Sequence, residues 1–215
     1  MPLVSTPAGD LGAVVGQPAP PFALPAVQGG TIDLAAYRGQ RSVVVWFSRG
    51  FTCPFCRRYM DSIIGGYQDL VAAEAEVIQV APNLLEGARS FLRGAPVPYP
   101  FVCDPDKRLY AVYGLGDLGV LAATRTAVVS FAHAFTTGDG SAQIRGVVAD
   151  IRNRNFVRRL HHHATTALEQ GLFFVDKQGI VQHRAIFGPI ESIPDAHGLA
   201  TLTRAHCTAR TLPAA

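Results

Sequence analysis

Two cysteines, Cys53 and Cys56, stand three positions apart in the segment SRGFTCPFCRRYM, residues 48–60. A C-x-x-C pair of this kind can form a redox-active disulfide, supply half of a metal site, or simply pack in the core. The segment also contains three arginines, Arg49, Arg57 and Arg58. Positive charge around a cysteine favours its thiolate, which is the nucleophilic form. The residue types therefore favour dithiol redox chemistry over structural packing.

The elements on either side of the pair predict where it lies. Residues 43–48, VVVWFS, are β-branched and aromatic and predict a strand buried on both faces of a mostly parallel sheet. Apolar residues then recur at helical spacing, which predicts a helix over 54–73. Pro54 suits the first helical turn, so Cys53 falls at the N-cap and Cys56 one turn later. Because a helix N-terminus stabilises an anion, we expect a low pKa and high reactivity for the Cys53 thiol.

The other histidines and cysteines of the chain are weaker candidates for a functional role. The only dense histidine cluster is the triplet His161, His162 and His163. Consecutive helical residues point in different directions and cannot converge on one ion, so we expect no metal site. Cys103 is expected to pack at a strand end, with resolving thiol as an alternative, and Cys207 receives no role.

Composition limits the other classes of function. The chain has 215 residues, 48% of them hydrophobic, which predicts one domain over 1–215 with one core. The formal net charge is +3, and 17 of the 19 basic residues are arginine, so neither nucleic acid nor a membrane surface is an expected partner. The first residues do not resemble a secretory signal and no apolar run could span a bilayer, so we expect a cytoplasmic location.

The remaining elements alternate and predict an α/β fold. We expect strands at 76–82 and 98–104, helices at 84–94 and 107–115, a hairpin over 171–188 and a closing helix over 191–206. Together they form a mixed central sheet flanked by helices. The termini, 1–14 and 207–215, are expected to be flexible. Residues 117–168 predict a helical insertion that packs an apolar face on the domain, or that forms a homodimer contact.

Residues 15–56 resemble the opening of peroxiredoxins in the alkyl hydroperoxide reductase and thiol-specific antioxidant superfamily. The similarity rests on Ala19, Pro20, Phe22 and Leu24, on the loop to Gly39 and on the strand that leads to Cys53. FVCDPDKRLYAVYGL and GLFFVDKQGIVQHR are also similar to that superfamily. The resemblance implies a thioredoxin-like fold of peroxiredoxin type and an antioxidant, thiol-dependent oxidoreductase that requires no cofactor.

The sequence also departs from the peroxiredoxin pattern. The threonine that such proteins carry three residues before the reactive cysteine is replaced by Gly50, and the proline seven residues before is replaced by Trp46. Thr52 is out of register. No arginine precedes GLFFVD, where Glu169 and Gln170 stand instead. The resemblance is therefore to a divergent branch with a C-P-F-C centre.

We predict that Cys53 attacks a peroxide or a disulfide, that Cys56 resolves the product, and that an external thiol or thioredoxin-like reductant restores the pair. Further substrate-binding candidates flank the cysteines, namely Arg49, Thr52, Pro54 and Phe55. Arg125 of the insertion is a candidate to replace the missing arginine beside the thiolate. The alternatives are a redox sensor or binding module that does not turn over, and a biosynthetic reductase for a larger substrate.

Overall fold

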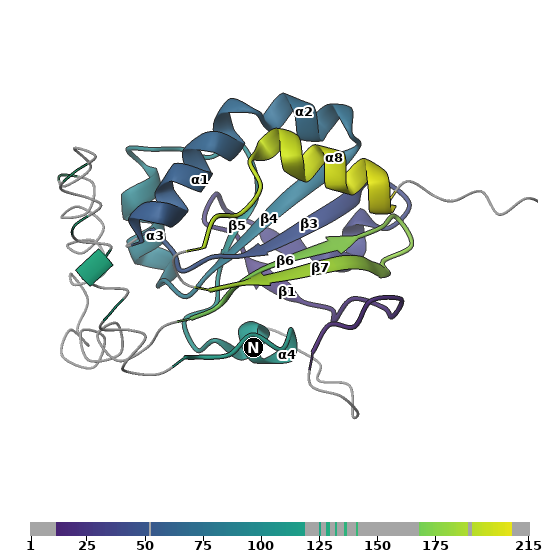
Figure 1. Cartoon of the computed structure of the whole chain (residues 1–215), viewed down its shortest axis with the longest axis horizontal. Helices are drawn as coiled ribbons and strands as arrows, with labels where there is room; N and C mark the ends of the chain where they lie inside the picture. Colours follow the sequence, from purple (N-terminus) through teal and green to yellow (C-terminus); the bar gives the residue numbers. More distant parts are fainter. Residues whose placement is uncertain are drawn as a thin grey trace, which may run out of the picture.

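The structure is a computed structural model (Figure 1). It describes residues 12–51, 53–118, 168–188 and 191–207. Within the segment between 118 and 168 it also describes a few single positions, Arg125, Val128, Val129, Ala132, Thr136 and Ser141.

The core of the fold is a five-stranded mixed sheet with the order β5-β4-β3-β6-β7. The strands are β3 (Ser42–Phe47), β4 (Ala75–Ala81), β5 (Phe101–Cys103), β6 (Gln170–Val175) and β7 (Val181–Phe187). The first three are parallel, while β6 runs antiparallel to β3 and β7 antiparallel to β6. All six residues of β3 are buried, as its uncharged β-branched sequence predicted. The predicted α/β class with a mixed central sheet is confirmed.

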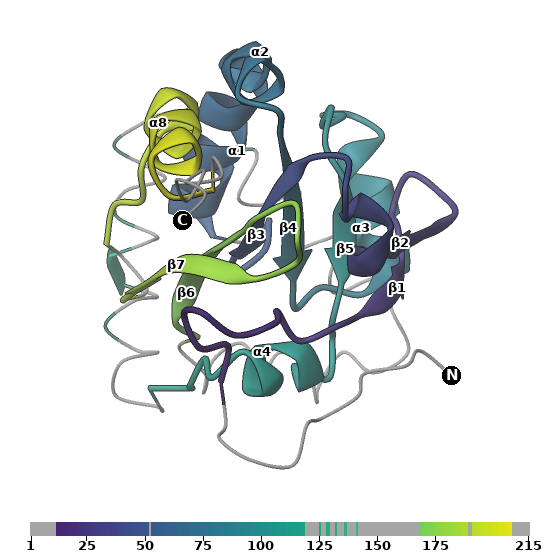
Figure 2. The same ribbon diagram turned by 90° about the vertical axis from the view of Figure 1, so that its right-hand side faces the viewer.

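Helices cover both faces of this sheet (Figures 1 and 2). On one face lie α1 (Pro54–Gly65), α2 (Tyr67–Ala72) and α8 (Ala196–Cys207), and α3 (Leu85–Leu92) lies beside β5. On the other face lies α4 (Arg108–Val112), together with the N-terminal segment that carries β1 (Ala23–Pro25), β2 (Thr31–Asp33) and the 3-10 helix η1 (Leu34–Tyr37). Two separate apolar clusters fill the spaces above and below the sheet, and both cysteines of the pair belong to the α1 side.

The single helix predicted over 54–73 is wrong, because the structure divides it at Gly66. The backbone of Gly66 has left the helical conformation, with φ −108° and ψ 18°. A Cβ at this position would lie 2.5 Å from the Cβ of Ala196, the first residue of α8. The glycine therefore ends α1 and also allows α8 to pack closely against the break.

Other elements are also shorter than predicted, among them β5, α4 and α8. Pro98 and Pro100 lack the N–H that a ladder requires, so β5 begins only at Phe101. The helix α4 ends before Gly114, which has a φ of +76° and stops the helix in the left-handed region. The helix α8 begins at Ala196, where the Asp195 carboxylate accepts a hydrogen bond from the N–H of Gly198 over 2.8 Å.

The parts of the chain expected to be flexible or inserted are described only in part. Ala13 and Cys207 are buried, although both fall in segments that were expected to be flexible. Most of the predicted insertion, 117–168, lies outside the described residues. Its described positions Arg125, Val128, Val129, Ala132, Thr136 and Ser141 are helical, Val128 is 65% exposed and Ala132 is exposed too. The packing of the insertion on the domain or in a homodimer contact stays a prediction. Across the described part of the chain, no helix is both long and apolar enough to cross a membrane.

Candidate active site

Cys53 and Cys56 lie where β3 meets α1, at the carboxyl end of the central strand. Cys53 is the N-cap of α1, as predicted, and Pro54 occupies the first helical turn, where its missing N–H breaks no hydrogen bond. Cys53 is 5% exposed, whereas Cys56, one turn further along, is fully buried. Both are free thiols. Cys53 is thus the one of the two that has a route to solvent.

The surroundings of Cys53 lower its pKa to about 6. The largest cause is the S–H of Cys56, which donates a hydrogen bond to the Cys53 sulfur; burial acts in the opposite direction. Next comes the charge of Arg49, whose Nη1 donates to Cys53 Sγ over 3.8 Å. The backbone N–H groups of Phe55 and Cys56 lower the pKa of Cys53 less than Arg49 does. Neither makes a capping hydrogen bond to the sulfur, so they act on it as the positive end of the helix. Near neutral pH, Cys53 is therefore a thiolate.

Cys56 has the opposite character. Burial is the main cause that raises its pKa well above the ordinary value, and the hydrogen bond to Cys53 and the charge of that thiolate raise it further. Its sulfur also donates to Oε1 of the buried Gln170 on β6, over 3.4 Å. One proton thus has two acceptors within reach. A nucleophilic thiol needs a low pKa, and a resolving thiol that stays protonated until it is needed has a high one. Cys53 and Cys56 differ in this way.

The loop between β3 and Cys53 is held by buried polar side chains. Ser48 Oγ accepts a hydrogen bond from the N–H of Gly50 over 3.2 Å, and the Tyr110 hydroxyl donates to the Ser48 carbonyl oxygen. The guanidinium of Arg57 donates to the Phe51 carbonyl oxygen over 2.7 Å. The sequence predicted that Arg57 would contribute positive charge to the thiolate, but it is buried against this loop, and Arg49 is the arginine whose charge lowers the Cys53 pKa.

Asn83 explains why residue 50 is a glycine. Gly50 has a φ of +80°, and a Cβ built on it would overlap Oδ1 of the fully buried Asn83. That oxygen accepts the backbone N–H of Phe51 over 3.3 Å. The Asn83 carboxamide, from the loop after β4, therefore fills the space in which the threonine of typical peroxiredoxins would begin its side chain. Sequence reasoning missed Asn83, although its place just after a strand parallel to β3 was a usable signal.

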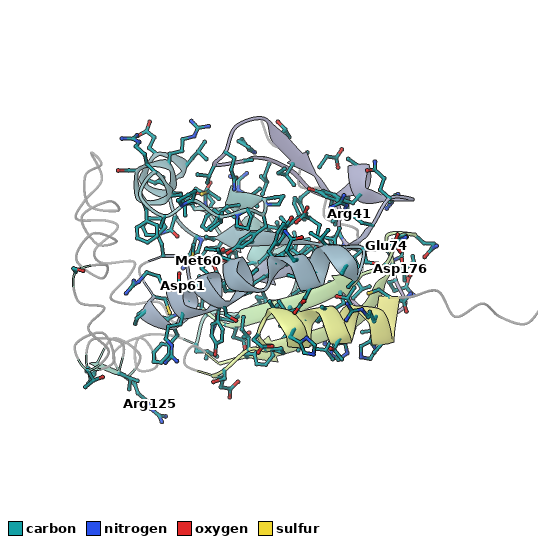
Figure 3. All side chains as sticks on the ribbon, turned by 90° about the horizontal axis from the view of Figure 1, so that it is seen from above. Arg41, Met60, Asp61, Glu74, Arg125 and Asp176 are labelled. Atoms are coloured by element: carbon teal, nitrogen blue, oxygen red, sulfur yellow. The ribbon has the colours of Figure 1, made fainter. Side chains whose placement is uncertain are left out.

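The other predicted site residues have different places. Pro54 is buried and Phe55 is partly exposed next to the pair. Arg125 is exposed, and in Figure 3 its side chain is directed away from the domain and lies apart from Met60 and Asp61 on α1. The structure does not bring Arg125 to Cys53, and Thr52 lies outside the described residues.

Metal-ligating side chains do not gather in the described part of the chain. No group of three or more histidines, cysteines, aspartates or glutamates there could hold an ion. The triplet His161 to His163 lies outside it.

Comparison with known proteins finds peroxiredoxins that are similar to this chain. A candidate peroxiredoxin of Mycobacterium tuberculosis is 29% identical over 99 residues, which are 46% of this chain and 62% of that relative, so the chain spans less than two thirds of its length. Chloroplastic peroxiredoxin Q of Sedum lineare is 25% identical over 159 residues, 73% of this chain and 78% of that protein. The crystal structure of peroxidoxin BcpB from Mycobacterium tuberculosis superposes with a TM-score of 0.57 at 14% identity, over 90% of this chain and 95% of that one.

A family model supplies the assignment. The model of the AhpC/TSA family matches residues 15–135, which include β1 to β5 and both Cys53 and Cys56 and make up more than half of the chain. The chain belongs to the AhpC/TSA family.

Proposed function

We propose that the chain is a thiol-dependent oxidoreductase that reduces peroxides or disulfides with Cys53 and Cys56. One observation carries the proposal: Cys53 is held as a thiolate, with a pKa of about 6, beside a fully buried Cys56 that keeps its proton. An ordinary buried cysteine pair would not separate its two pKa values in this direction. Membership of the AhpC/TSA family supports the same chemistry.

The reaction divides into two steps at Cys53. With a peroxide, the thiolate attacks one oxygen, the O–O bond breaks, water or an alcohol leaves after protonation, and Cys53 becomes a sulfenic acid. With a disulfide, the thiolate attacks one sulfur, a thiolate leaves, and Cys53 carries a mixed disulfide. The Cys56 thiolate then attacks the Cys53 sulfur to form the internal disulfide. The bond from Cys53 to the sulfenic oxygen or to the substrate sulfur breaks, and water, after protonation, or the substrate thiolate leaves. An external thiol or a thioredoxin-like protein supplies the two electrons that return both residues to thiols.

Arg49 has a second role in this proposal. Its guanidinium lies beside the Cys53 sulfur, so it is also placed to stabilise the negative charge that develops on the oxygen or sulfur leaving during attack. Phe55, partly exposed, and Pro54 would form the apolar wall next to the thiolate. Thr52 stays a predicted substrate contact, and the structure gives no support for such a role of Arg125.

The space occupied by Asn83 bears on which oxidant is preferred. Gly50 offers no hydroxyl to orient a peroxide, and the overlap with Asn83 excludes a side chain there. Preorganised donors of this kind are worth about 3 kcal/mol, or roughly a hundredfold in rate. We therefore expect peroxide reduction to be slow relative to peroxiredoxins that carry the threonine, and disulfides to compete as substrates.

The test is catalytic turnover. The reduced protein is supplied with dithiothreitol, or with thioredoxin and its reductase, and with either hydrogen peroxide or a small disulfide. Saturable turnover that Cys53→Ser abolishes supports the proposal. A protein that is oxidised once and then consumes no further oxidant is a redox sensor, the second candidate, and the enzymatic proposal is then wrong. In a cell, the reducing cytoplasm predicted from the sequence would supply the thiol.

A further inference from the structure

Gln170 has a buried carboxamide that contacts Cys56, the proposed resolving thiol. It is the first residue of β6, it is fully buried, and its Oε1 accepts the hydrogen bond from Cys56 Sγ over 3.4 Å, across 114 residues of sequence. It faces the apolar cluster between the sheet and α1, together with Leu172 two residues further along the strand. Gln170 occupies the strand position where the sequence lacks the arginine expected of a peroxiredoxin.

Only half of this carboxamide is used. Gln170 Nε2 is buried and has no hydrogen-bond partner in the described part of the chain. A buried donor without a partner costs about 1–3 kcal/mol, a cost that an apolar side chain of the same length would not carry. The stability of the fold therefore does not explain why a glutamine stands here.

The reduced and reacting forms of Cys56 need opposite hydrogen-bond partners. The thiol offers an S–H and needs an acceptor, which Oε1 supplies. When Cys56 attacks, it must do so as a thiolate, which needs a donor. Rotation of the carboxamide by half a turn exchanges two groups of nearly equal size and would place Nε2 where Oε1 now lies. The rotation would break no other hydrogen bond, because Nε2 has none in the described residues.

We propose that Gln170 is a positioning residue for the resolution step, in which its carboxamide rotates to donate Nε2–H to the Cys56 thiolate. This inference rests on the proposed function and adds a residue to it. In the mixed-disulfide case, the Cys56 thiolate attacks the Cys53 sulfur and the Cys53–Cys56 bond forms. The bond between Cys53 and the substrate sulfur breaks, the substrate leaves as a thiolate with the electron pair, and the Cys56 proton has already passed to solvent. Cys56 is oxidised and the substrate sulfur is reduced.

Other charged or titratable groups also have fields that reach Cys56, and Cys53 is the one whose charge changes when it takes up the substrate. In the described part of the chain they are Cys53, Arg49 and the hydroxyl of Tyr110. Burial and a neighbouring acidic group keep the pKa of Tyr110 high, so it stays neutral. Cys53 is no longer a thiolate once it carries the substrate. Loss of that charge eases deprotonation of Cys56, and a donor from Gln170 would ease it further.

The test separates the two steps with a chromogenic aryl disulfide such as 5,5′-dithiobis(2-nitrobenzoate). The first equivalent of coloured thiolate reports attack by Cys53, and the second reports resolution by Cys56. In Gln170→Met, the first release should keep the wild-type rate, and the second should slow by about tenfold, the usual worth of a hydrogen bond to a charged group. The midpoint of the second step should move to higher pH, and the melting temperature should stay equal or rise. Gln170→Leu serves as a second variant.

The control is Gln182→Met, on the neighbouring strand, where Nε2 donates to Asp176 at the opposite end of the sheet. It should leave both releases unchanged. If Gln170→Met and Gln170→Leu release the second equivalent at the wild-type rate and pH midpoint, or slow both releases equally, the role of Gln170 is wrong and the proposed function survives. If the wild-type protein releases no first equivalent, the proposed reaction of Cys53 with disulfides is wrong and the role of Gln170 falls with it.

Discussion

Arg49 is a charged side chain through which the reactivity of Cys53 can be changed. Its Nη1 is 3.8 Å from the Cys53 sulfur, and its charge is the largest contribution from a charged side chain that lowers the Cys53 pKa to about 6. Replacement with methionine keeps most of the length and removes the charge. The helix N-terminus and the S–H of Cys56 remain, so only part of the shift should be lost.

The expected size follows from the distance. An opposite charge within about 4–6 Å lowers a pKa by roughly 1–3 units, and burial of the thiol places the effect of Arg49 at about 1 unit or more. The Cys53 pKa should therefore rise from about 6 to about 7 in Arg49→Met. At pH 6 the thiolate fraction then falls from about one half to about one tenth, while at pH 8.5 nearly all of Cys53 is a thiolate in both proteins.

The assay is the rate of alkylation of Cys53 by iodoacetamide between pH 5 and pH 9. A thiolate of higher pKa is intrinsically more nucleophilic, so single rates mislead. The ratio of the rate at pH 6 to the rate at pH 8.5 removes this effect, and it should fall about fivefold in Arg49→Met. Arg58→Met, which removes an exposed arginine from α1, is the control and should keep the wild-type midpoint. An unchanged midpoint in Arg49→Met would refute the assignment.

Three further outcomes follow from the geometry. Cys56→Ser should retain the first reaction and accumulate a mixed disulfide on Cys53 with a small disulfide substrate, seen by intact mass; no adduct would count against the proposed order of attack. Gly50→Ala should lower the free energy of unfolding by about 2 kcal/mol or more in urea titrations, because it combines a left-handed φ with overlap on a buried side chain. Gly30→Ala, with a φ of +72° and open space, should cost only about 1 kcal/mol; equal losses would remove the packing explanation. Gly66→Ala should destabilise by about 1–3 kcal/mol, because the added Cβ would lie 2.5 Å from the Cβ of Ala196 on α8. Gly65→Ala, whose Cβ would meet nothing within 4 Å, should stabilise by up to about 1 kcal/mol, and the reverse order would contradict the close packing of α8.

Features set by neighbours in sequence were predictable. The β-branched run predicted β3, and Pro54 placed Cys53 at the N-cap, because both depend on backbone preferences within a few residues. The alternation of later elements predicted the mixed sheet in the same way. Their ends were less predictable, because a single proline or glycine moved them by several residues.

Features that depend on distant contacts were not predictable from the residues alone. Asn83 accepts a hydrogen bond from Phe51 across 32 residues of sequence, and Gln170 accepts one from Cys56 across 114. No local sequence pattern predicts either hydrogen bond. The direction of the Arg57 side chain was also not predictable from the sequence. Its position in the sequence favoured contact with the thiolate, but the helix turns its guanidinium toward the loop carbonyl of Phe51.

The most direct test of the dithiol mechanism is the mass of one peptide. Trypsin cuts after Arg49 and Arg57, so the peptide GFTCPFCR contains both Cys53 and Cys56, while Cys103 and Cys207 fall in other peptides. The reduced protein is treated with one equivalent of hydrogen peroxide or, separately, of a small disulfide, and then alkylated and digested. The mechanism predicts that this peptide loses two hydrogens and resists alkylation, while the other two cysteines are alkylated. Oxidation that leaves this peptide fully alkylated, or that links Cys53 to Cys103 or Cys207, would contradict it.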